Sequence, residues 1–482
     1  MKRLAVALAF CLATPAAAAV AVGSKAFPES YLLAEMMAQT IEAEGLVVER
    51  RFGFEGTLVC FEALRRGEIQ VYPEYTGTLR EVILGGRPLE ALAESGVAVL
   101  PGFGFSNSYG LAVRRDTAER LDLESISDLA GAPDLRIALS HEFRERADGW
   151  PGLKRRYGLT AVPGGIEHGL AYRALAQGRI DVTDVYTTDG DIERHGLVVL
   201  ADDRQYFPDY RAVPLAAQAL PAAARAAIGR LAGRIDAERM RKLNARVVVE
   251  GLTFAAVAHD FLVAEGLAAG DPPPADRAGR LLRNTLVHLK LTGIALLAAC
   301  LVGLVTSLLV FRSATATRVV LYVAGLMQTV PSIALLALMI PLLGVGQTPA
   351  IVALFLYALL PIVSSTVTAL RSVDPVLLRV SEAMGMTRWQ QARLVRVPLA
   401  VPYVLTGLKT AAVISIGTAT LAAFIGAGGL GEPIVTGLAL NDPGLILEGA
   451  LPAAGLAVAT EIAFELAERR LIPAHLRARR SS

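Results

Sequence analysis

The chain has 482 residues, of which 53% are hydrophobic and 19% are charged. A soluble domain carries about 25% charged residues, so this composition excludes a disordered chain and argues against a wholly soluble one. The 47 Lys and Arg nearly balance the 45 Asp and Glu, which gives no indication of nucleic-acid binding. Three cysteines exclude a disulfide scaffold and a multi-cysteine zinc site, so we expect no metal.

Residues 1–19 have the form of a secretory signal peptide. A basic Lys-Arg pair precedes an apolar run, and three alanines at 17–19 provide a small-residue cleavage site. The apolar run is too short to be an ordinary membrane span, although an uncleaved anchor is the alternative. We therefore expect the residues that follow to be exported.

Residues 20–270 alternate between strand-like and helix-like patterns. Strands are expected at 20–22, 47–54, 69–72, 135–139, 180–182 and 198–200, with helices such as 28–45 and 57–66 between them. This alternation predicts a parallel or mixed sheet that helices cover on both faces, and the length fits two lobes joined by a hinge. The segment 271–284 opens with Asp271 and three prolines, which predicts a stiff linker.

Residues 285–470 are predicted to form an all-α membrane domain with about five spans. Apolar stretches long enough to cross about 30 Å of hydrocarbon cover 289–311, 319–343, 350–370, 400–424 and 445–466. Arginines follow the first, third and fifth stretches, whereas the loops 344–349 and 425–444 carry no Lys or Arg. The positive-inside rule places the arginine-rich segments in the cytoplasm, which leaves residues 20–270 outside and 471–482 as a cytoplasmic tail.

Motifs for enzyme chemistry were sought along the whole chain. A P-loop needs a Gly-Lys pair to hold phosphates, and no lysine in this chain follows a glycine. The pattern G-x-G-x-x-G occurs at 426–431. It follows a predicted span and not a strand, so a tight re-entrant loop is the better interpretation. We therefore expect no catalytic residue and no cofactor in this chain.

The predicted cytoplasmic loop at 375–399 carries the most specific motif. Glu382, Ala383 and Gly385 lie in it, and an apolar-Pro pair begins the next span. This resembles the EAA loop of ABC-importer permeases, with Met384 in place of the second alanine. The resemblance implies that Glu382, Ala383 and Gly385 couple the membrane domain to a separate ATPase subunit, which binds the ATP.

Other stretches of the membrane domain resemble the permease of osmoprotectant importers, which take up glycine betaine, carnitine and choline. They lie at 328–332, 341–346 and 421–426, and the resemblance covers nearly all of 285–470. Two permease halves are needed, so a homodimer with two ATPases is the simplest assembly.

The exported domain resembles the matching osmoprotectant-binding proteins. The motifs that carry this resemblance lie at 22–29, 72–78, 107–113, 185–190 and 206–210. The resemblance implies a two-lobed type II periplasmic binding protein that captures glycine betaine, choline or carnitine outside the inner membrane. Ala26 and Ser30 depart from the usual Asn and Gln, and both positions lie near the ligand in the family.

Four tyrosines at positions that match the family are candidates for a ligand cage: Tyr75, Tyr109, Tyr186 and Tyr210. A quaternary ammonium group has no N–H to donate, but aromatic faces hold it by cation–π attraction. Three polar residues match positions that contact a ligand carboxylate or the polar wall of the cleft: Lys25, Thr78 and Arg146. A packed core tyrosine and a surface arginine are the structural alternatives.

The sequence therefore predicts a binding protein fused to a permease in the inner (plasma) membrane, with the binding domain on the outer side. One alternative is an importer for another polar solute such as an amino acid, which would need an Asp and Arg pair in place of the tyrosines. A second alternative is a membrane-anchored sensory receptor. That receptor would need a cytoplasmic output domain, whereas about fifteen residues follow the last predicted span.

Overall fold

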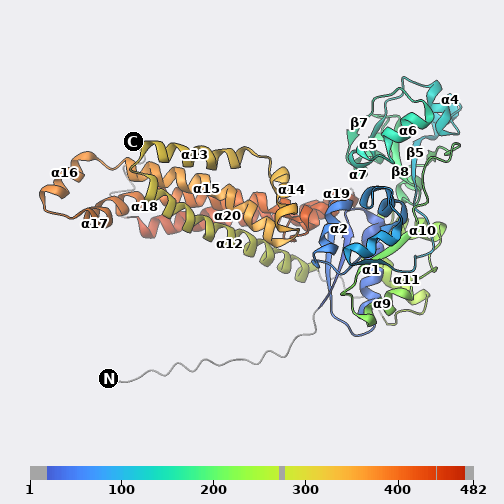
Figure 1. Ribbon diagram of the computed structural model, residues 1–482, viewed down its shortest axis with the longest axis horizontal. Coiled ribbons are helices and arrows are strands. Elements are labelled where there is room, and N and C mark those ends of the chain that lie inside the picture. Colours follow the sequence, from blue (N-terminus) through green and yellow to red (C-terminus); the bar gives the residue numbers. More distant parts are fainter. Residues whose placement is uncertain (1–18, 271–276, 441, 473–482) are drawn as a thin grey trace.

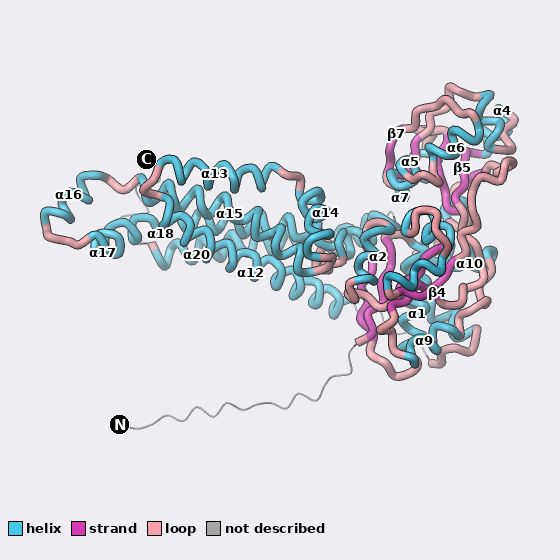
Figure 2. Tube along the Cα trace, viewed as in Figure 1, coloured by secondary structure: helices cyan, strands magenta, loops and turns pink. Residues whose placement is uncertain are grey.

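The computed structural model describes residues 19–270, 277–440 and 442–472. A two-lobed α/β part and a helical bundle lie end to end (Figures 1 and 2). Residues 1–18 of the predicted signal peptide lie outside the described residues, and so do residues 473–482 of the predicted tail.

The strands of the described residues are Val20–Lys25 (β1), Val48–Phe54 (β2), Val71–Tyr75 (β3), Val97–Val99 (β4), Tyr109–Arg114 (β5), Ala138–Ser140 (β6), Gly164–Ile166 (β7), Val182–Tyr186 (β8), Leu197–Val199 (β9) and Ala212–Ala217 (β10). The α-helices of this part are Pro28–Glu42 (α1), Thr57–Arg65 (α2), Thr76–Thr78 (α3), Arg115–Leu121 (α4), His141–Glu145 (α5), Trp150–Tyr157 (α6), His168–Ala176 (α7), Gly190–Arg194 (α8), Ala222–Gly229 (α9), Ala237–Val248 (α10) and Phe254–Ala264 (α11). Short 3-10 or π-helical turns lie at Leu79–Ile83, Leu89–Ser95 and Ile126–Gly131.

Lobe 1 is built on a five-stranded mixed sheet with the order β2-β1-β3-β10-β4. Strands β1, β2 and β3 are parallel, as the alternation of strands and helices predicts, and β10 runs antiparallel to β3 and β4. Helix α1 begins at Pro28, whose fixed φ and missing N–H suit the first helical position. Every residue from Glu29 to Ile41 is buried, so α1 forms the centre of the core of this lobe.

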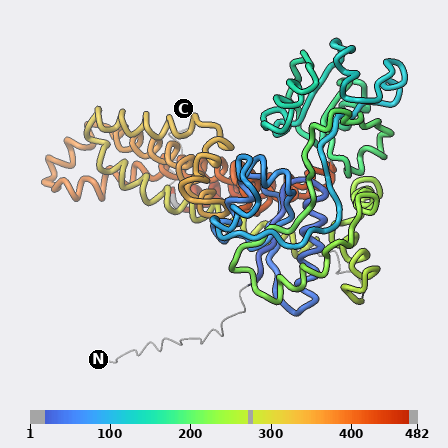
Figure 3. Tube along the Cα trace, turned by 45° about the vertical axis from the view of Figure 1, so that its right-hand side comes forward, coloured from blue at the N-terminus to red at the C-terminus, as the bar shows by residue number. Residues whose placement is uncertain are grey.

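Lobe 2 is built on the antiparallel strands β8-β5-β9 and the short parallel pair β6-β7. Chain segments pass between the two lobes (Figure 3). Two of them are joined by an antiparallel bridge between Ser106 and Arg211 and by a 3.0 Å hydrogen bond from the amide of Asn107 to the carbonyl of Tyr210. Paired crossing segments of this kind allow the lobes to close about a hinge.

The helical bundle contains Arg277–Val310 (α12), Ala314–Thr329 (α13), Ser332–Leu343 (α14), Gln347–Arg371 (α15), Pro375–Ala383 (α16), Arg388–Gln391 (α17), Val397–Ala419 (α18), Glu432–Leu440 (α19) and Pro443–Leu471 (α20), with π-helical and 3-10 turns at Ala392–Arg396 and Thr420–Ile425. Four of the described helices are long and apolar enough to cross a membrane, or five if α13 and α14 together form one broken span. This agrees with the predicted membrane domain of about five spans.

The structure adds detail to one predicted span and to the predicted linker. The stretch 319–343, expected to be long enough to cross the membrane, is broken between α13 and α14 with a bend of 98°. Pro331 explains this break, because a proline favours an extended conformation in the preceding residue, and Val330 has φ −64° and ψ 127°. Within the predicted linker at 271–284, residues 277–284 belong to helix α12, which begins at Arg277.

Lobe 1 rests on one end of the bundle. The amide of Glu55 donates to the carbonyl of Phe424 (3.1 Å), and the guanidinium of Arg66 donates to the carbonyl of Pro341 (3.0 Å). Helix α19 also contacts α7 of lobe 2. Helices α16 and α17 lie at the opposite end of the bundle (Figure 1). The space between the lobes therefore lies at the end of the membrane domain that the arginine pattern assigns to the outside.

Candidate ligand-binding site

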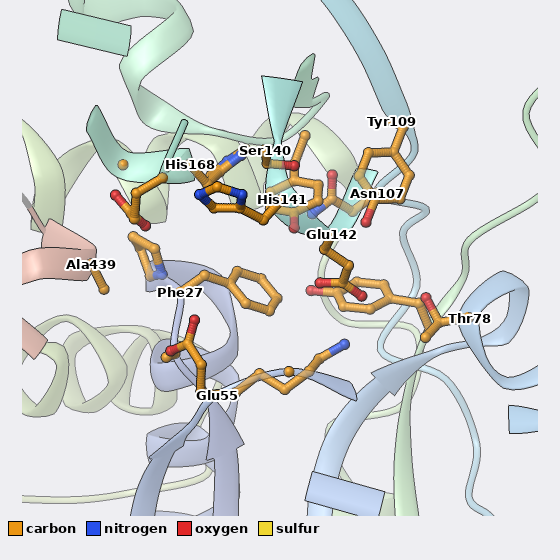
Figure 4. Close-up of a pocket in the computed structure, with 18 of the residues that line it drawn as sticks. Phe27, Glu55, Thr78, Asn107, Tyr109, Ser140, His141, Glu142, His168 and Ala439 are labelled. Carbon is orange, nitrogen blue, oxygen red and sulfur yellow. The ribbon is translucent and has the colours of Figure 1, made fainter. Parts of the chain in front are cut away.

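A cavity of about 140 Å³ lies between the two lobes. All seven residues that the sequence predicts for the ligand line it: Lys25, Tyr75, Thr78, Tyr109, Arg146, Tyr186 and Tyr210. Figure 4 shows that side chains from both lobes point into this cavity, with Phe27 and Thr78 on one side and Tyr109 and His168 on the other. The structure thus brings together residues that lie up to 185 positions apart in the chain, and their role toward a ligand stays a prediction.

The four tyrosines are brought together by strand pairing. Tyr109 begins β5 and Tyr186 ends β8, and the two are direct cross-strand neighbours whose ring centroids are 5.1 Å apart. Tyr75 ends β3 opposite the first residue of β10, and Tyr210 lies two residues before β10. The rings of Tyr109 and Tyr210 are 5.7 Å apart at 81°. The four rings therefore line the cavity from both lobes.

Phe27 is a fifth aromatic side chain of the cavity, and the sequence analysis missed it. Its ring centroid lies 5.4 Å from that of Tyr186 and 6.3 Å from that of Tyr75, so it links the tyrosines of the two lobes. Phe27 lies inside the motif at 22–29. An aromatic residue directly before the first helix was the signal that could have identified it.

The lysine and the arginine that line the cavity are already paired with carboxylates. The ammonium of Lys25 lies 2.6 Å from Glu74, and both side chains are buried. Arg146 binds Asp148 through two nitrogens, at 2.8 and 2.5 Å, and Glu142 through a third, at 3.0 Å. Burial disfavours the charge of Arg146, but Tyr109, Asp148 and Glu142 together raise its pKa above the usual value. Arg146 therefore stays charged and keeps unused N–H groups.

His168 is a second residue that the sequence analysis missed. Its ring packs against that of Tyr186, with centroids 4.4 Å apart and the ring planes tilted by 37°. Burial alone would lower the pKa of His168, but the charge of Asp184, 3.7 Å away, and the charge and hydrogen bond of Asp189, at 3.1 Å, raise it to about 10. The imidazole therefore carries a positive charge at neutral pH. No local sequence pattern indicates this role, because Asp184 lies in the neighbouring strand β8 and Asp189 lies in the loop that follows it.

Hydroxyl hydrogen bonds fix two of the tyrosine rings. Tyr75 donates to Glu29 (2.5 Å) and Tyr210 donates to Asp148 (2.7 Å). Burial and the adjacent Glu29 raise the pKa of Tyr75 well above its usual value, so its hydroxyl remains protonated and acts as a donor. These bonds hold each ring in one orientation toward the cavity.

Three acidic side chains also line the cavity, namely Glu55 of lobe 1 and Glu142 and Glu167 of lobe 2. Glu55 keeps contact with solvent. Partial removal from water and the charges of Glu167 and Glu142 raise its pKa to about 7. Ala439 of α19 lines the same cavity, so the membrane domain contributes to its wall. An acidic wall of this kind favours cations.

The predicted coupling residues lie at the far end of the bundle. Glu382 and Ala383 end α16, and Gly385 follows in a left-handed conformation with φ 74°. The amide of Gly385 donates to the carbonyl of Glu382 (2.9 Å), which closes the helix end. A capping box between Thr387 and Gln390 then starts α17. The glycine thus makes the turn between two short helices.

Exposed apolar side chains cover these two helices: Val376, Leu377, Val380, Met384 and Trp389 are between 41% and 73% exposed. Exposed apolar groups on a short helical loop are typical of a contact surface for another protein.

Comparison with known proteins gives two family matches and several close relatives. Residues 18–264 match the substrate-binding domain of the ABC-type glycine betaine transport system, and residues 293–473 match the binding-protein-dependent transport system inner membrane component. The choline transport system permease protein OpuBB of Bacillus subtilis is 43% identical over 196 residues, which cover 41% of this chain and 90% of that protein. The osmoprotectant import permease protein OsmW of Salmonella typhimurium is 43% identical over 188 residues, 38% of this chain and 87% of that one.

One solved structure similar to the binding domain is a glycine betaine/carnitine/choline ABC transporter protein, with 28% identity and a TM-score of 0.44. The match covers 52% of this chain and 99% of that one.

Proposed function

The chain belongs to the ABC-type importers, as a substrate-binding domain of the glycine betaine type fused to an inner-membrane permease component, and from that premise we propose that it captures a quaternary ammonium osmoprotectant and conducts it inward. It is a multi-pass membrane transporter component and not an enzyme, and its ATPase is a separate subunit. Glycine betaine, choline and carnitine are the candidate ligands, since relatives are named for their transport.

One observation carries the proposal, namely the five aromatic rings that line the cavity from both lobes. Each ring that faces a quaternary ammonium contributes about 0.5–2 kcal/mol, depending on how far the pair is removed from water. The Asp148 and Arg146 side chains bind each other. Because Asp148 is also held by the hydroxyl of Tyr210, it is not free to bind the α-ammonium group of an amino acid, and such a ligand is therefore disfavoured.

The transport cycle that we propose follows from this arrangement. Closure of the lobes about the hinge encloses the ligand while lobe 1 rests on the bundle. ATP-driven movement of the partner ATPases then acts on α16 and α17, and the bundle opens toward the cytoplasm. Glu382, Ala383 and Gly385 are the proposed coupling residues, and the exposed apolar side chains around them form the contact with the ATPase.

A homodimer is the assembly that we propose, because one chain supplies a single permease half. Each chain would bring its own binding domain and one ATPase. Measurement of the mass of the detergent-solubilised complex tests this, since a single copy of the permease per complex would contradict it.

Uptake into proteoliposomes tests the proposed function. The full chain is reconstituted with its ATPase and supplied with labelled choline, glycine betaine or carnitine. We expect ATP-dependent accumulation of at least one of them and no accumulation of a neutral amino acid such as leucine. Uptake of none of the three by an assembly that hydrolyses ATP would refute the proposal.

A further inference from the structure

Glu29 is a fully buried acidic side chain in the first turn of α1, beside the cage. Its carboxylate accepts four hydrogen bonds. Tyr75 (2.5 Å) and Asn107 (2.9 Å) donate to Oε1, and Thr188 (2.5 Å) and Asn244 (3.0 Å) donate to Oε2. An ionised carboxylate only accepts hydrogen bonds, so four converging donors match the charged form.

The partners of Glu29 differ from those of the other buried acids. Seven Asp and Glu side chains are buried among the described residues. Six of them lie within ion-pair distance of a basic side chain: Glu35, Glu74, Asp148, Asp181, Asp184 and Asp189. Glu29 forms no ion pair with any described residue, and its four donors are neutral. Burial raises the pKa of Glu29, and the hydrogen bonds from Thr188, Tyr75 and Asn244 oppose that rise.

We propose that Glu29 is the counter-charge of the ligand's quaternary ammonium group and acts on it through Tyr75. The ring of Tyr75 lines the cavity, and its hydroxyl donates to Glu29. A negative charge at the hydroxyl end raises the electron density of the ring, which strengthens its attraction for a cation. This inference rests on the proposed function. Glu29 does not line the cavity and is a positioning residue.

The other charges around the cavity make this assignment specific. Lys25, Arg146 and His168 each have carboxylate partners of their own, so none of them is needed to neutralise Glu29. The buried charge of Glu29 therefore has neutral donors and the N-terminus of α1 as its partners, and a cation in the cavity would add an opposite charge. Because the low-dielectric interior strengthens the attraction between the two charges, removal of the charge should weaken the binding of cations in particular.

A purely structural role is the alternative, since Asn107, Thr188 and Asn244 lie where the lobes meet. Loss of a structural contact would weaken every ligand to a similar extent. Loss of a counter-charge would weaken only cationic ligands. A neutral molecule with the shape of choline separates the two cases, and 3,3-dimethyl-1-butanol has this shape because a carbon atom replaces the nitrogen.

The test measures the affinity of the full chain in lipid nanodiscs for choline and for this neutral alcohol. We expect Glu29→Gln to lower the affinity for choline about tenfold or more and to leave that for the alcohol within about twofold. Glu35→Gln is the matched control. It removes the same charge from a buried position on the same helix, but Glu35 is paired with Arg50, so the ratio of the two affinities should not change.

The inference is overturned if the ratio of choline affinity to alcohol affinity in Glu29→Gln equals that of the wild type. It is also overturned if this ratio falls in Glu35→Gln as much as it does in Glu29→Gln. If Glu29→Gln shows no cooperative thermal unfolding, Tyr75→Phe replaces it. That variant keeps the ring but breaks the link to Glu29, and a ratio equal to that of the wild type would again overturn the inference. Failure of the wild-type chain to bind any quaternary ammonium would instead refute the proposed function.

Discussion

At the level of single residues, the cavity combines aromatic faces with basic groups that carboxylates hold in place. Lys25 lies 5.2 Å from the ring centroid of Tyr75, and Arg146 lies 5.2 Å from that of Tyr109. The ring of His168 packs against that of Tyr186. A ligand cation therefore meets rings whose orientation is already fixed. This preorganisation limits the entropy lost on binding.

The sequence predicted seven lining residues because six lie in motifs that resemble binding proteins, and Arg146 matches a position of the same family. It missed Phe27, although that residue lies in the motif at 22–29, and it could not predict His168 or Glu29 as parts of the site. The charge of His168 depends on Asp184 and Asp189, and the environment of Glu29 depends on Asn107 and Asn244 from distant segments. Pairing of this kind is decided by tertiary packing and leaves no local pattern.

The first prediction concerns Arg146, whose guanidinium keeps N–H groups that Asp148 and Glu142 do not use. If a ligand carboxylate binds there by charge-assisted hydrogen bonds, Arg146→Ala should lower the affinity for glycine betaine about tenfold more than that for choline. Calorimetric titration of the full chain measures both affinities. The exposed Arg144→Ala serves as the control, and equal losses for both ligands would make Arg146 a structural residue.

The second prediction concerns the pH dependence of stability that His168 confers. Its pKa of about 10 lies above the usual value near 6.5, so the charged form stabilises the fold below pH 6.5. This contribution is lost as the pH rises toward 10. His168→Asn should therefore lower the stability by on the order of 2 kcal/mol near pH 6.5 and by much less near pH 10.

Denaturant unfolding of both proteins at the two pH values measures this difference. His195→Asn is the control, because burial and two nearby arginines lower the pKa of His195 and it stays neutral above pH 7. An equal loss of stability in His168→Asn at both pH values would contradict the assignment.

At the level of elements, the expected strands overlap six of the ten strands of the described residues, whereas β4, β5, β7 and β10 were not expected. The expected strand at 47–54 and helix at 57–66 correspond to β2 and α2. Periodicity could not indicate that β10 enters the sheet of lobe 1 between β3 and β4, since that pairing joins residues about 140 positions apart. It also missed the break at Pro331, because the residues on both sides of it are apolar.

The third prediction concerns the turn between α16 and α17. A Cβ at Gly385 would meet no other atom within 4 Å, so a substitution there acts through the backbone, at a cost of about 1–2 kcal/mol for a left-handed conformation. Gly385→Val should lower both the co-purification of the ATPase and the rate of uptake while ligand affinity stays unchanged. Gly385→Asn should lower ATPase co-purification and uptake much less, because Asn tolerates the left-handed conformation.

Pull-down of the ATPase, uptake assays and ligand titration on the same preparations test this prediction. Normal ATPase recovery with normal uptake in Gly385→Val would remove this turn from the coupling mechanism. If Gly385→Val also lost ligand binding, the protein would be misfolded. Gly385→Asn would then be the test of the turn, and we expect its ATPase recovery and uptake to be close to those of the wild type.

At the level of the whole molecule, the ligand cavity and the coupling helices lie at opposite ends of one long structure (Figure 1). The distribution of arginines predicted this polarity, since basic loops stay in the cytoplasm. The contact of lobe 1 with the bundle could not be predicted, because it depends on single backbone hydrogen bonds such as that from Glu55 to Phe424. Ligand capture and ATP use must therefore communicate along the length of the bundle.

The central claim is that the cleft binds a quaternary ammonium through its aromatic rings, and titration of the full chain with choline and glycine betaine tests it most directly. The wild-type chain should bind at least one of them. Tyr186→Phe keeps the ring, and its affinity should stay within about threefold of the wild-type value. Tyr186→Ala should lose about 1–2 kcal/mol of binding free energy, or roughly five- to thirtyfold in affinity. Binding to Tyr186→Ala as tight as to the wild type, or no binding of either ligand to the wild type, would contradict the account.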